Sequence, residues 1–397
     1  MTAPAPATAR KRPKDRKDQI SRAASTLFRS RGYHDVSIAD IASEVGITPG
    51  AVYRHFSSKD ELLFQVVSAG LGRFVQLAED ATDLDEYLRA SGRLALEHRA
   101  LASLWMREAR HLSEERGALL RRKLTGIAER LAVLLHEERP ELAADDAELL
   151  AWALLAVFAS FDMHRIAVAQ RDFLQLYLRF TRVIVQCPMP GGTQVHTEPV
   201  ATPTTPIVGM PRREQLLAEA TRLFSRHGFN SVSMAEIGAA TGITGSTIYK
   251  HFESKQDLLA AAIARAIEQL QANMARAMAS GTTPEQALDR LLRSQVEFSL
   301  TERHVVEVLI SELAELPEKE RRAVAVAQRQ YADVWVRLIA AVRPDLEPAA
   351  VKITGETISS IISNLVRTDR LVTRGDLEDR ILDICDAALH LPADPER

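Results

Sequence analysis

Two stretches rich in hydrogen-bond donors occur in the chain, Ile47–Lys59 (ITPGAVYRHFSSK) and Ile243–Lys255 (ITGSTIYKHFESK). The copies stand 196 residues apart (243 − 47), and the register continues without a gap into the leucines that follow. Each copy offers a tyrosine hydroxyl, a basic side chain, an imidazole and an ammonium within about two helical turns. Donors of these types suit contacts with phosphates and with the edges of bases.

The residues around each stretch predict how these donors are positioned. Thr48 and Thr244 are suited to cap a short helix. Pro49 takes the first helical position after Thr48, where a backbone N–H would have no partner within the helix. Gly46 and Gly242 precede the caps and favour a tight turn. A helix, a glycine turn and a capped short helix together predict a helix-turn-helix.

Longer helices are expected on both sides of each stretch. In the first copy one helix is expected over 16–30 and a second begins at a cap on Ser37. A longer helix is expected to start after Ser57 or Ser58 and to run to about Ala78. Apolar residues at helical spacing predict the buried faces, which are Ile20, Ala23, Ala24, Leu27 and Phe28, then Ile38, Ile41, Ala42 and Val45. In the second copy the same signals predict helices over 211–227, from Ser233, from Thr244 and from Ser254.

Both stretches resemble the DNA-binding domain of TetR-family transcriptional regulators. The pattern G-[ITV]-[ST]-x-x-x-[LIV]-Y-x-H-F-x-x-K-x-x-L matches from Gly46 to Leu62 and again from Gly242 to Leu258. Leu27-Phe28, Gly32-Tyr33 and Ile38–Ala42 match upstream. Residues 12–16 (RPKDR) and 104–110 (LWMREAR) further resemble the mycobacterial tandem regulators that repress mammalian-cell-entry lipid-import operons.

The resemblance implies two groups of DNA contacts in each copy. Phosphates are expected to be held by Tyr53, His55 and Lys59 in the first copy and by Tyr249, His251 and Lys255 in the second. Bases and grooves are expected to be contacted by Thr48, Pro49, Gly50 and Arg54, and by Thr244, Gly245, Ser246 and Lys250. No catalytic residue, metal site or cofactor is expected.

Charge distinguishes the two copies. The whole chain carries a formal net charge of −3, so bulk charge does not predict nucleic-acid binding. Up to Leu63, however, basic residues outnumber acidic ones by 11 to 7, whereas over Ile207–Leu259 the ratio is 6 to 5. The first copy is therefore expected to bind phosphates better.

Composition limits the remaining classes. No apolar run is long enough to span a bilayer, and the N-terminus has no apolar segment typical of a secretory signal. Cys187 and Cys385 are far apart in sequence, which gives no zinc spacing and favours a reduced, cytoplasmic setting.

The expected fold is all-α, with two tandem TetR-like units. The predicted segments are a disordered basic arm over 1–15, a first DNA-binding domain over 16–63, a first effector domain over 64–186, a Pro-rich linker over 187–210, a second DNA-binding domain over 211–259 and a second effector domain over 260–397. Glu108 and Arg139 return as Glu312 and Arg343 at an offset of 204, so about eight residues are added in the second copy. The segment 281–284 (GTTP) is a plausible place for some of them.

The effector domains carry apolar helical faces and a few candidate ligand contacts. By resemblance, a ligand pocket and a partner-binding pair of late helices are implied, and the candidates are Trp105, Glu108, Trp152, Phe158, Phe161, Glu312 and Asn364. For each aromatic residue, core packing is the favoured interpretation. For Glu108 and Glu312, a role as partner of a helix terminus or of an arginine inside the bundle is favoured over coupling between a pocket and the DNA-binding domain. His111 is interpreted as a ligand contact or as a surface charge.

Together these patterns predict a DNA-binding regulator whose two effector domains pair within one chain. The partners would be double-stranded operator DNA with two unlike half-sites and an apolar, acyl-CoA or steroid-like effector, with no membrane. Association of two chains is left open. The alternatives are an architectural DNA-binding protein without an effector, a transcriptional activator, a second copy that serves only dimerisation, and an enzyme using His111, His164 or Cys187.

Overall fold

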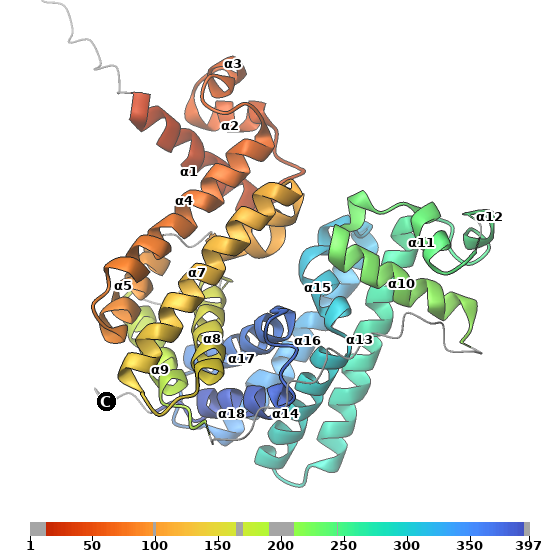
Figure 1. Cartoon of the computed structure of the whole chain (residues 1–397). Coiled ribbons are helices and arrows are strands. Elements are labelled where there is room, and N and C mark those ends of the chain that lie inside the picture. Colours follow the sequence, from red (N-terminus) through yellow and green to blue (C-terminus); the bar gives the residue numbers. More distant parts are fainter. Residues whose placement is uncertain (1–12, 98–100, 164–169, 190–209, 244, 393–397) are drawn as a thin grey trace, which may run out of the picture. The chain divides into compact units, whose positions relative to one another are not determined.

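The computed structural model describes residues 13–97, 101–163, 170–189, 210–243 and 245–392, and the segments described contain helices and no β-strand (Figure 1). The first half of the chain, residues 13–189, contains α1 Pro13–Arg31, α2 Ile38–Val45, α3 Pro49–Tyr53, α4 Lys59–Asp80, α5 Leu84–Glu97, α6 Leu101–Ser103, the π-helix η1 Leu104–Glu108, the 3-10 helix η2 Ala109–His111, α7 Glu114–Glu138, α8 Ala144–Met163 and α9 Gln170–Val185.

The second half, residues 210–392, repeats this order. It contains α10 Arg212–His227, the 3-10 helix η3 Phe229–Ser231, α11 Met234–Ala240, α12 Gly245–Ile248, α13 Lys255–Ser280, α14 Pro284–Thr301, α15 Arg303–Ser311, the 3-10 helix η4 Leu313–Glu315, α16 Glu318–Val342, α17 Pro348–Arg367 and α18 Leu377–Leu389. The all-α fold with two similar units in one chain is confirmed.

Several local details differ from the expectations. The first helix begins at Pro13, three residues earlier than expected, because proline is tolerated in the first helical turn. Ser58 accepts the Glu61 amide and so caps α4, whereas Ser57 bonds to the Glu61 carboxylate. The predicted arm up to residue 12 and the linker over 190–209 lie outside the described residues.

Four of the eight added residues lie within α13, and none lies at the 281–284 junction. The offset between the halves is 196 where α4 and α13 begin (255 − 59) and 200 where they end (280 − 80). At the junction the offset stays at 200, since the Thr82–Glu86 bond in one half matches Thr282–Gln286 in the other. From α7 and α16 onward it is 204 (318 − 114), so four further residues fall after the start of α14.

The described chain divides into two compact units. One comprises residues up to Arg73 together with Ala100–Leu124, and the other comprises Phe74–Arg99 together with Thr125–Arg397. Helices α4 and α7 each contribute residues to both units. The first helix-turn-helix belongs to the first unit, whereas the second helix-turn-helix and the late helices of both halves belong to the second unit.

Each helix-turn-helix has its own apolar core. In the first unit the fully buried residues include Ile20, Ala24, Phe28, Ile41, Val52, Phe56, Leu62 and Leu63. In the second unit the residues 196 positions later, Leu216, Ala220, Phe224, Ile237, Ile248, Phe252, Leu258 and Leu259, form one buried cluster. Equivalent residues therefore hold the two domains together, and the repeat in sequence is a repeat in packing.

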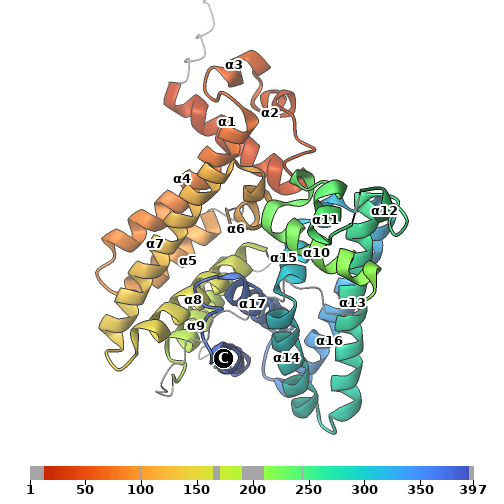
Figure 2. The same ribbon diagram turned by 45° about the vertical axis from the view of Figure 1, so that its right-hand side comes forward.

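The late helices of the two halves pack on each other within the second unit. Helix α17 packs along α8, and α18 packs on α9, as Figures 1 and 2 both show. Helix α8 is apolar on nearly all sides and almost wholly buried, as expected for a helix enclosed by neighbours. The Ser360 hydroxyl donates to the Ala156 carbonyl at 2.8 Å, and these residues are equivalent at the offset of 204 (360 − 156). Contact between equivalent positions is the mark of a two-fold axis, so the halves pair as an intrachain pseudo-dimer.

A matched arginine closes the end of each half. Arg139 donates to the Val185 and Cys187 carbonyls at 2.7 and 2.9 Å, just past α9. Arg343 donates to the Leu389 and Leu391 carbonyls, both at 2.6 Å, just past α18. These free carbonyls at a helix terminus need donors, and a guanidinium supplies them with charge of the favourable sign.

Candidate nucleic-acid interface

The first recognition helix presents its polar residues to solvent. Thr48 caps α3 by accepting the Ala51 amide at 3.3 Å, and Gly46 makes the preceding turn at φ 70°. Thr48, Pro49, Gly50 and Arg54 are exposed, and Tyr53 keeps 55% of its surface accessible. Val52 is completely buried, which fixes the helix on its core and leaves the other side free.

The second recognition helix repeats this arrangement in the residues that can be compared. Gly242 turns at φ 70°, Ile248 is buried, and Tyr249 is 56% exposed. Lys250 and His251 are exposed as well, whereas His55 in the first helix is half-buried. Thr244 and the side chain of Ser246 lie outside the described residues. An exposed tyrosine at the same position of both helices is unusual for a structural residue and suits contact with a partner.

The two lysines predicted to bind phosphates have structural roles in both DNA-binding domains. Lys59 donates to the Tyr33 and Val36 carbonyls at 2.7 and 2.9 Å, and its Nζ lies 4.1 Å from the Tyr33 ring centroid. Lys255 donates to the Phe229 and Val232 carbonyls at 2.6 and 2.8 Å. These bonds clamp the loop between the first two helices, so two of the three ammonium donors are engaged within the protein. A DNA-contact role for either lysine remains a prediction.

Burial lowers the pKa of both ammonium groups, and nearby carboxylates oppose the shift. For Lys59 the opposing charges are Asp35 and Glu108, and for Lys255 they include Glu315 and Glu312. Glu108 is buried and accepts the Tyr33 amide at 3.0 Å, directly after the end of α1. This is the helix-terminus role favoured from the sequence, and it ties η1 to the first DNA-binding domain.

The pair of side chains beside this clamp differs between the halves. In the first half His34 and His111 are hydrogen-bonded at 3.1 Å, and His111 stacks on Tyr33 at 5.2 Å between ring centroids. In the second half the equivalent positions are Asn230 and Glu315, which are bonded at 3.1 Å. His111 therefore packs against the DNA-binding domain, a position that its spacing in sequence did not reveal.

The other residues proposed for effector binding mostly pack or bond within the protein. Phe161 is buried against Phe173, Tyr177 and Phe180, and Phe158 lies edge-on to Phe74 at 4.5 Å. Asn364 donates to the Ser360 carbonyl at 2.8 Å within α17.

The three remaining candidates are Trp105, Glu312 and Trp152. Trp105 is half-buried, whereas Glu312 is buried and accepts the Ser311 hydroxyl at 3.2 Å. Trp152 has a buried indole nitrogen without a hydrogen-bond partner among the described atoms. An effector role for these residues remains a prediction.

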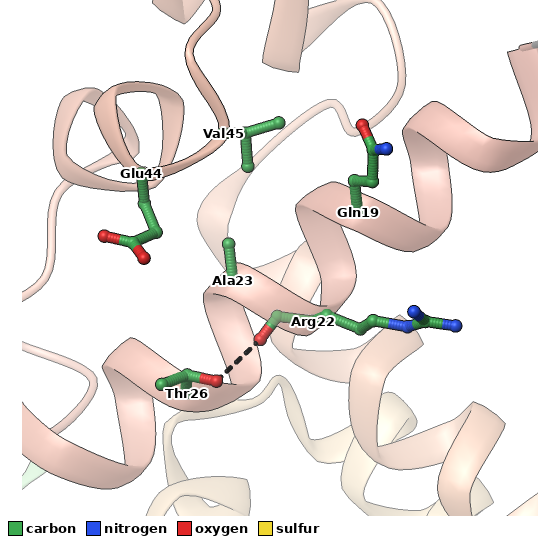
Figure 3. A pocket seen from close by; sticks show the side chains of 6 residues that line it. All are labelled: Gln19, Arg22, Ala23, Thr26, Glu44 and Val45. Atoms are coloured by element: carbon green, nitrogen blue, oxygen red, sulfur yellow. Dashed lines mark hydrogen bonds between the residues drawn. The ribbon is translucent and has the colours of Figure 1, made fainter. Parts of the chain in front are cut away.

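Two surface hollows are lined by other residues. One lies on the first DNA-binding domain between α1 and the end of α2, and Figure 3 shows its lining of Gln19, Arg22, Ala23, Thr26, Glu44 and Val45. Ala23 and Val45 were expected in the core, but they are half-exposed at this hollow. The other lies between α13 and α14, with Arg276, Arg290 and Phe298 in its wall.

Comparison with family models identifies the two helix-turn-helix domains. Residues 20–66 and 216–262 each match the model described as bacterial regulatory proteins of the tetR family, and residues 281–367 match a tetracyclin repressor-like C-terminal domain. The chain therefore carries two DNA-binding domains of the tetR family. The family consists of DNA-binding regulators, which agrees with the prediction that the chain is not an enzyme.

The curated relatives that this chain resembles are named as transcriptional regulators, and one of them is named for fatty acid metabolism. This chain is 34% identical over 110 residues to the transcriptional repressor KstR2 of Mycolicibacterium smegmatis, and the aligned stretch covers 26% of this chain and 54% of the relative. It is 32% identical over 78 residues to the fatty acid metabolism regulator protein of Bacillus subtilis, covering 20% and 39%. A third relative is the transcriptional activator FasR of Mycolicibacterium smegmatis, at 36% over 81 residues, covering 19% and 37%. The chain thus spans about half or less of the length of these relatives.

Solved structures give similar matches to part of the chain. The ketosteroid transcriptional regulator KstR2 of Mycobacterium tuberculosis matches with a TM-score of 0.41 and 21% identity, covering 45% of this chain and 93% of that one. The regulator AibR, solved with isovaleryl coenzyme A and operator DNA, matches with a TM-score of 0.33 and 22% identity, covering 36% and 80%.

Two predicted absences concern the described residues alone. Within them, no helix combines the length and the apolar character needed to cross a bilayer. No group of three or more metal-ligating side chains lies close enough to hold an ion in the same part of the chain.

Proposed function

We propose that the chain is a cytoplasmic regulator that binds one operator with both recognition helices. The observation that carries this proposal is the repeated display of α3 and α12, each with an exposed tyrosine and an exposed basic residue. Two such helices, entering successive major grooves about 34 Å apart, are the usual requirement for binding by this motif. Here the intrachain pairing of α8 and α9 with α17 and α18 supplies both helices from one chain.

The two half-sites of this operator are expected to differ. Thr48-Pro-Gly-Ala51 in the first copy corresponds in sequence to Thr244-Gly-Ser-Thr247 in the second, and Arg54 corresponds to Lys250. Arginine binds guanine or phosphate through two donors at once, whereas lysine offers a point charge. A base contact through Arg54 therefore discriminates sequence more strongly than one through Lys250.

Footprinting on the promoter and titration of single variants test this proposal. Arg54→Ala is expected to weaken operator binding roughly 5- to 150-fold, equal to about 1–3 kcal/mol, and to relax the sequence preference of one half-site only. Lys250→Ala should weaken binding less and affect the other half-site. A perfectly palindromic footprint would refute unlike half-sites.

Two further results would favour other functions. Binding unaffected by Tyr249→Ala and Lys250→Ala would reduce the second domain to a dimerisation role. Uniformly weak sequence preference would favour an architectural protein.

A small apolar effector, with an acyl-CoA or steroid-like structure, is the expected signal for release of DNA. The support comes from the names of the relatives and from the apolar interior around Trp152 and Phe158. A ligand can release DNA only if it prefers the conformation that binds DNA poorly.

Thermal-shift screening against acyl-CoAs and steroid acids, followed by operator release, measures this preference. A compound that stabilises the protein and releases the operator supports repression. Promoter activity that rises with the protein present would favour an activator. The lipid-import operons indicated by the sequence are the first promoters to test.

A further inference from the structure

Two glycines of the first half lie inside long helices without a packing reason. Gly72 is in α4, and Gly126 is in α7. A Cβ at Gly72 would lie 3.9 Å from the Lys123 Nζ, and a Cβ at Gly126 would meet no described atom within 4 Å. Alanine would therefore fit at both positions and would strengthen both helices, because glycine has more backbone freedom to lose.

The other glycines of these two helices differ from this pair. A Cβ at Gly70 of α4 would lie 2.5 Å from the Leu101 Cδ1, and Leu101 is buried, so Gly70 is needed for close packing against α6. Gly117 lies in the first turns of α7, where a Cβ would lie 3.3 Å from the Arg121 guanidinium, the far end of a flexible side chain.

The two unexplained glycines stand beside the division between the compact units. The division cuts α4 between Arg73 and Phe74, directly after Gly72 and its neighbour. It cuts α7 between Leu124 and Thr125, directly before Gly126. The remaining crossing, at residues 99 and 100, lies outside the described residues. The two long helices that connect the units are thus weakest where the units divide.

Side-chain bonds fasten α4 to α7 on either side of these glycines. Within the first unit, Lys123 donates to the Ser68 hydroxyl at 2.8 Å. Within the second unit, Arg130 donates to the Ala78 and Ala81 carbonyls at 3.1 and 3.2 Å. The glycines fall in the stretch between the two fastenings. A few residues that bend between two separately packed bodies are the usual construction of a hinge.

The second half has neither these glycines nor this division. Its matching helices α13 and α16 contain no glycine, and Gln330 stands where α7 has Gly126 (126 + 204). All of the described second half belongs to one compact unit.

Polar contacts within that unit connect the second DNA-binding domain to the pairing helices. Ser225 of α10 is hydrogen-bonded to His304 of α15 at 2.7 Å, and Glu307 of α15 is paired with Arg367 of α17. Helix α15 is thereby held at both ends, by the DNA-binding domain and by a helix of the pseudo-dimer core.

We propose that Gly72 and Gly126 form a hinge that lets the first DNA-binding domain move relative to the effector helices, whereas the second DNA-binding domain is held fixed. The hinge is a property of the chain with or without DNA. A consequence for DNA rests on the proposed function: the second domain would fix the position on the operator, and the first would adapt to the spacing of the half-sites.

Spin labels at equivalent exposed positions measure the two domains separately in the full chain. Ser43→Cys with Glu137→Cys spans the hinge in the first half. Ala239→Cys with Ala341→Cys spans the equivalent stretch of the second half, at offsets of 196 and 204. The distribution of distances between the labels is expected to be roughly twofold broader for the first pair.

Two controls accompany this measurement. The unmodified chain, whose Cys187 and Cys385 are both buried, reports labelling at other sites. Dilution with unlabelled chain removes distances between chains. Distributions of equal width in the two halves would refute the hinge.

Alanine substitutions test whether the glycines are the cause. Gly72→Ala with Gly126→Ala should narrow the first distribution and leave the second unchanged, and the chain should fold at least as stably, because alanine favours both helices. The matched control is Gly117→Ala, which changes α7 away from the division and should leave both widths unchanged. A first distribution that the double variant does not narrow, or that Gly117→Ala narrows equally, would refute the assignment to these glycines.

Operator fragments whose half-sites are moved by single base pairs test the consequence for DNA. The unmodified chain should bind over a wider range of spacings than the Gly72→Ala, Gly126→Ala variant. An equal range, together with a narrowed distance distribution, would refute the role of the hinge in operator binding. Loss of all sequence preference in the unmodified chain would instead refute the proposed function, and the distance measurement would still decide the hinge.

Discussion

The joint between DNA-binding domain and effector helices is built differently in the two halves around a shared lysine clamp. The first joint consists of Tyr33, His34, Lys59, Glu108 and His111. Its lysine bonds match those of the second half, but its contacts across the joint run through an aromatic stack and an imidazole pair.

The second joint consists of Phe229, Asn230, Lys255, Glu312 and Glu315. Here the Asn230 side-chain amide donates to the Glu315 carboxylate, with no aromatic stack between the two side chains. Both halves keep the hydrogen bonds from the lysine to the carbonyls of the loop after the first helix, because buried carbonyls need donors. Side chains that only join one element to another have diverged.

The largest expected effect is a loss of stability when the lysine that both joints share is replaced. Replacing Lys59 by Met, or Lys255 by Met, leaves two carbonyls without their charged donor and should cost about 2 kcal/mol of stability in either half. Denaturant unfolding measures the loss. If stability is unchanged while DNA affinity falls, the lysines serve DNA and not the loop.

A smaller loss of stability is expected when Glu108 is replaced. Glu108→Ala removes the acceptor of the Tyr33 amide and should cost about 1–2 kcal/mol, whereas Glu108→Gln keeps an acceptor and should cost less. Hydrogen exchange at the Tyr33 amide is the direct measurement. Exchange that is equally slow in the Ala variant would show that this bond does not hold the first joint.

A pH effect confined to the second half is expected at His304. Its Nδ1 bonds to Ser225 of α10 at 2.7 Å, and burial, with Arg303, Arg226 and Arg222 nearby, lowers its pKa to about 4 from an ordinary 6.5. Asp369 opposes the shift.

Between these pH values the unfolded chain binds a proton that the folded chain does not, so stability should fall as pH drops from about 6.5 to about 4. His304→Gln should flatten this slope. Unfolding titrations at several pH values would show an unchanged slope if the assignment is wrong.

The smallest effect is expected from exchanging the pairs that differ. His34→Asn with His111→Glu places the second joint's pair in the first, with a change below about 1 kcal/mol at neutral pH. Each pair forms one hydrogen bond across its joint, so the exchanged joint should hold α1 about as well as the native one. Hydrogen exchange of α1 compares them, and a large loss of protection in the exchanged chain would show that the stack of His111 on Tyr33 holds the first joint.

The amino-acid sequence by itself determined the local structure of both DNA-binding domains. Ser37, Thr48 and Ser254 cap the helices expected of them, and Gly46 and Gly242 turn where the pattern requires positive φ. The repeat and the all-α class also followed from spacing, because caps, turns and apolar periods depend on nearby residues. The pairing of the late helices was implied by the resemblance to TetR-family regulators and not by spacing. The exposure of the polar residues of α3 also depends on local helical spacing, because Val52 alone is buried in this helix.

Only the tertiary structure decided which distant side chains meet. That Lys59 reaches two carbonyls 23 and 26 residues away, that His111 stacks on Tyr33, and that Arg374 pairs with Asp146 are contacts without a local signature. One four-residue addition likewise lies inside α13, since the capped junction after it kept its length. Long-range contacts depend on how whole helices pack, and a polar residue in a sequence does not reveal which buried partner will satisfy it.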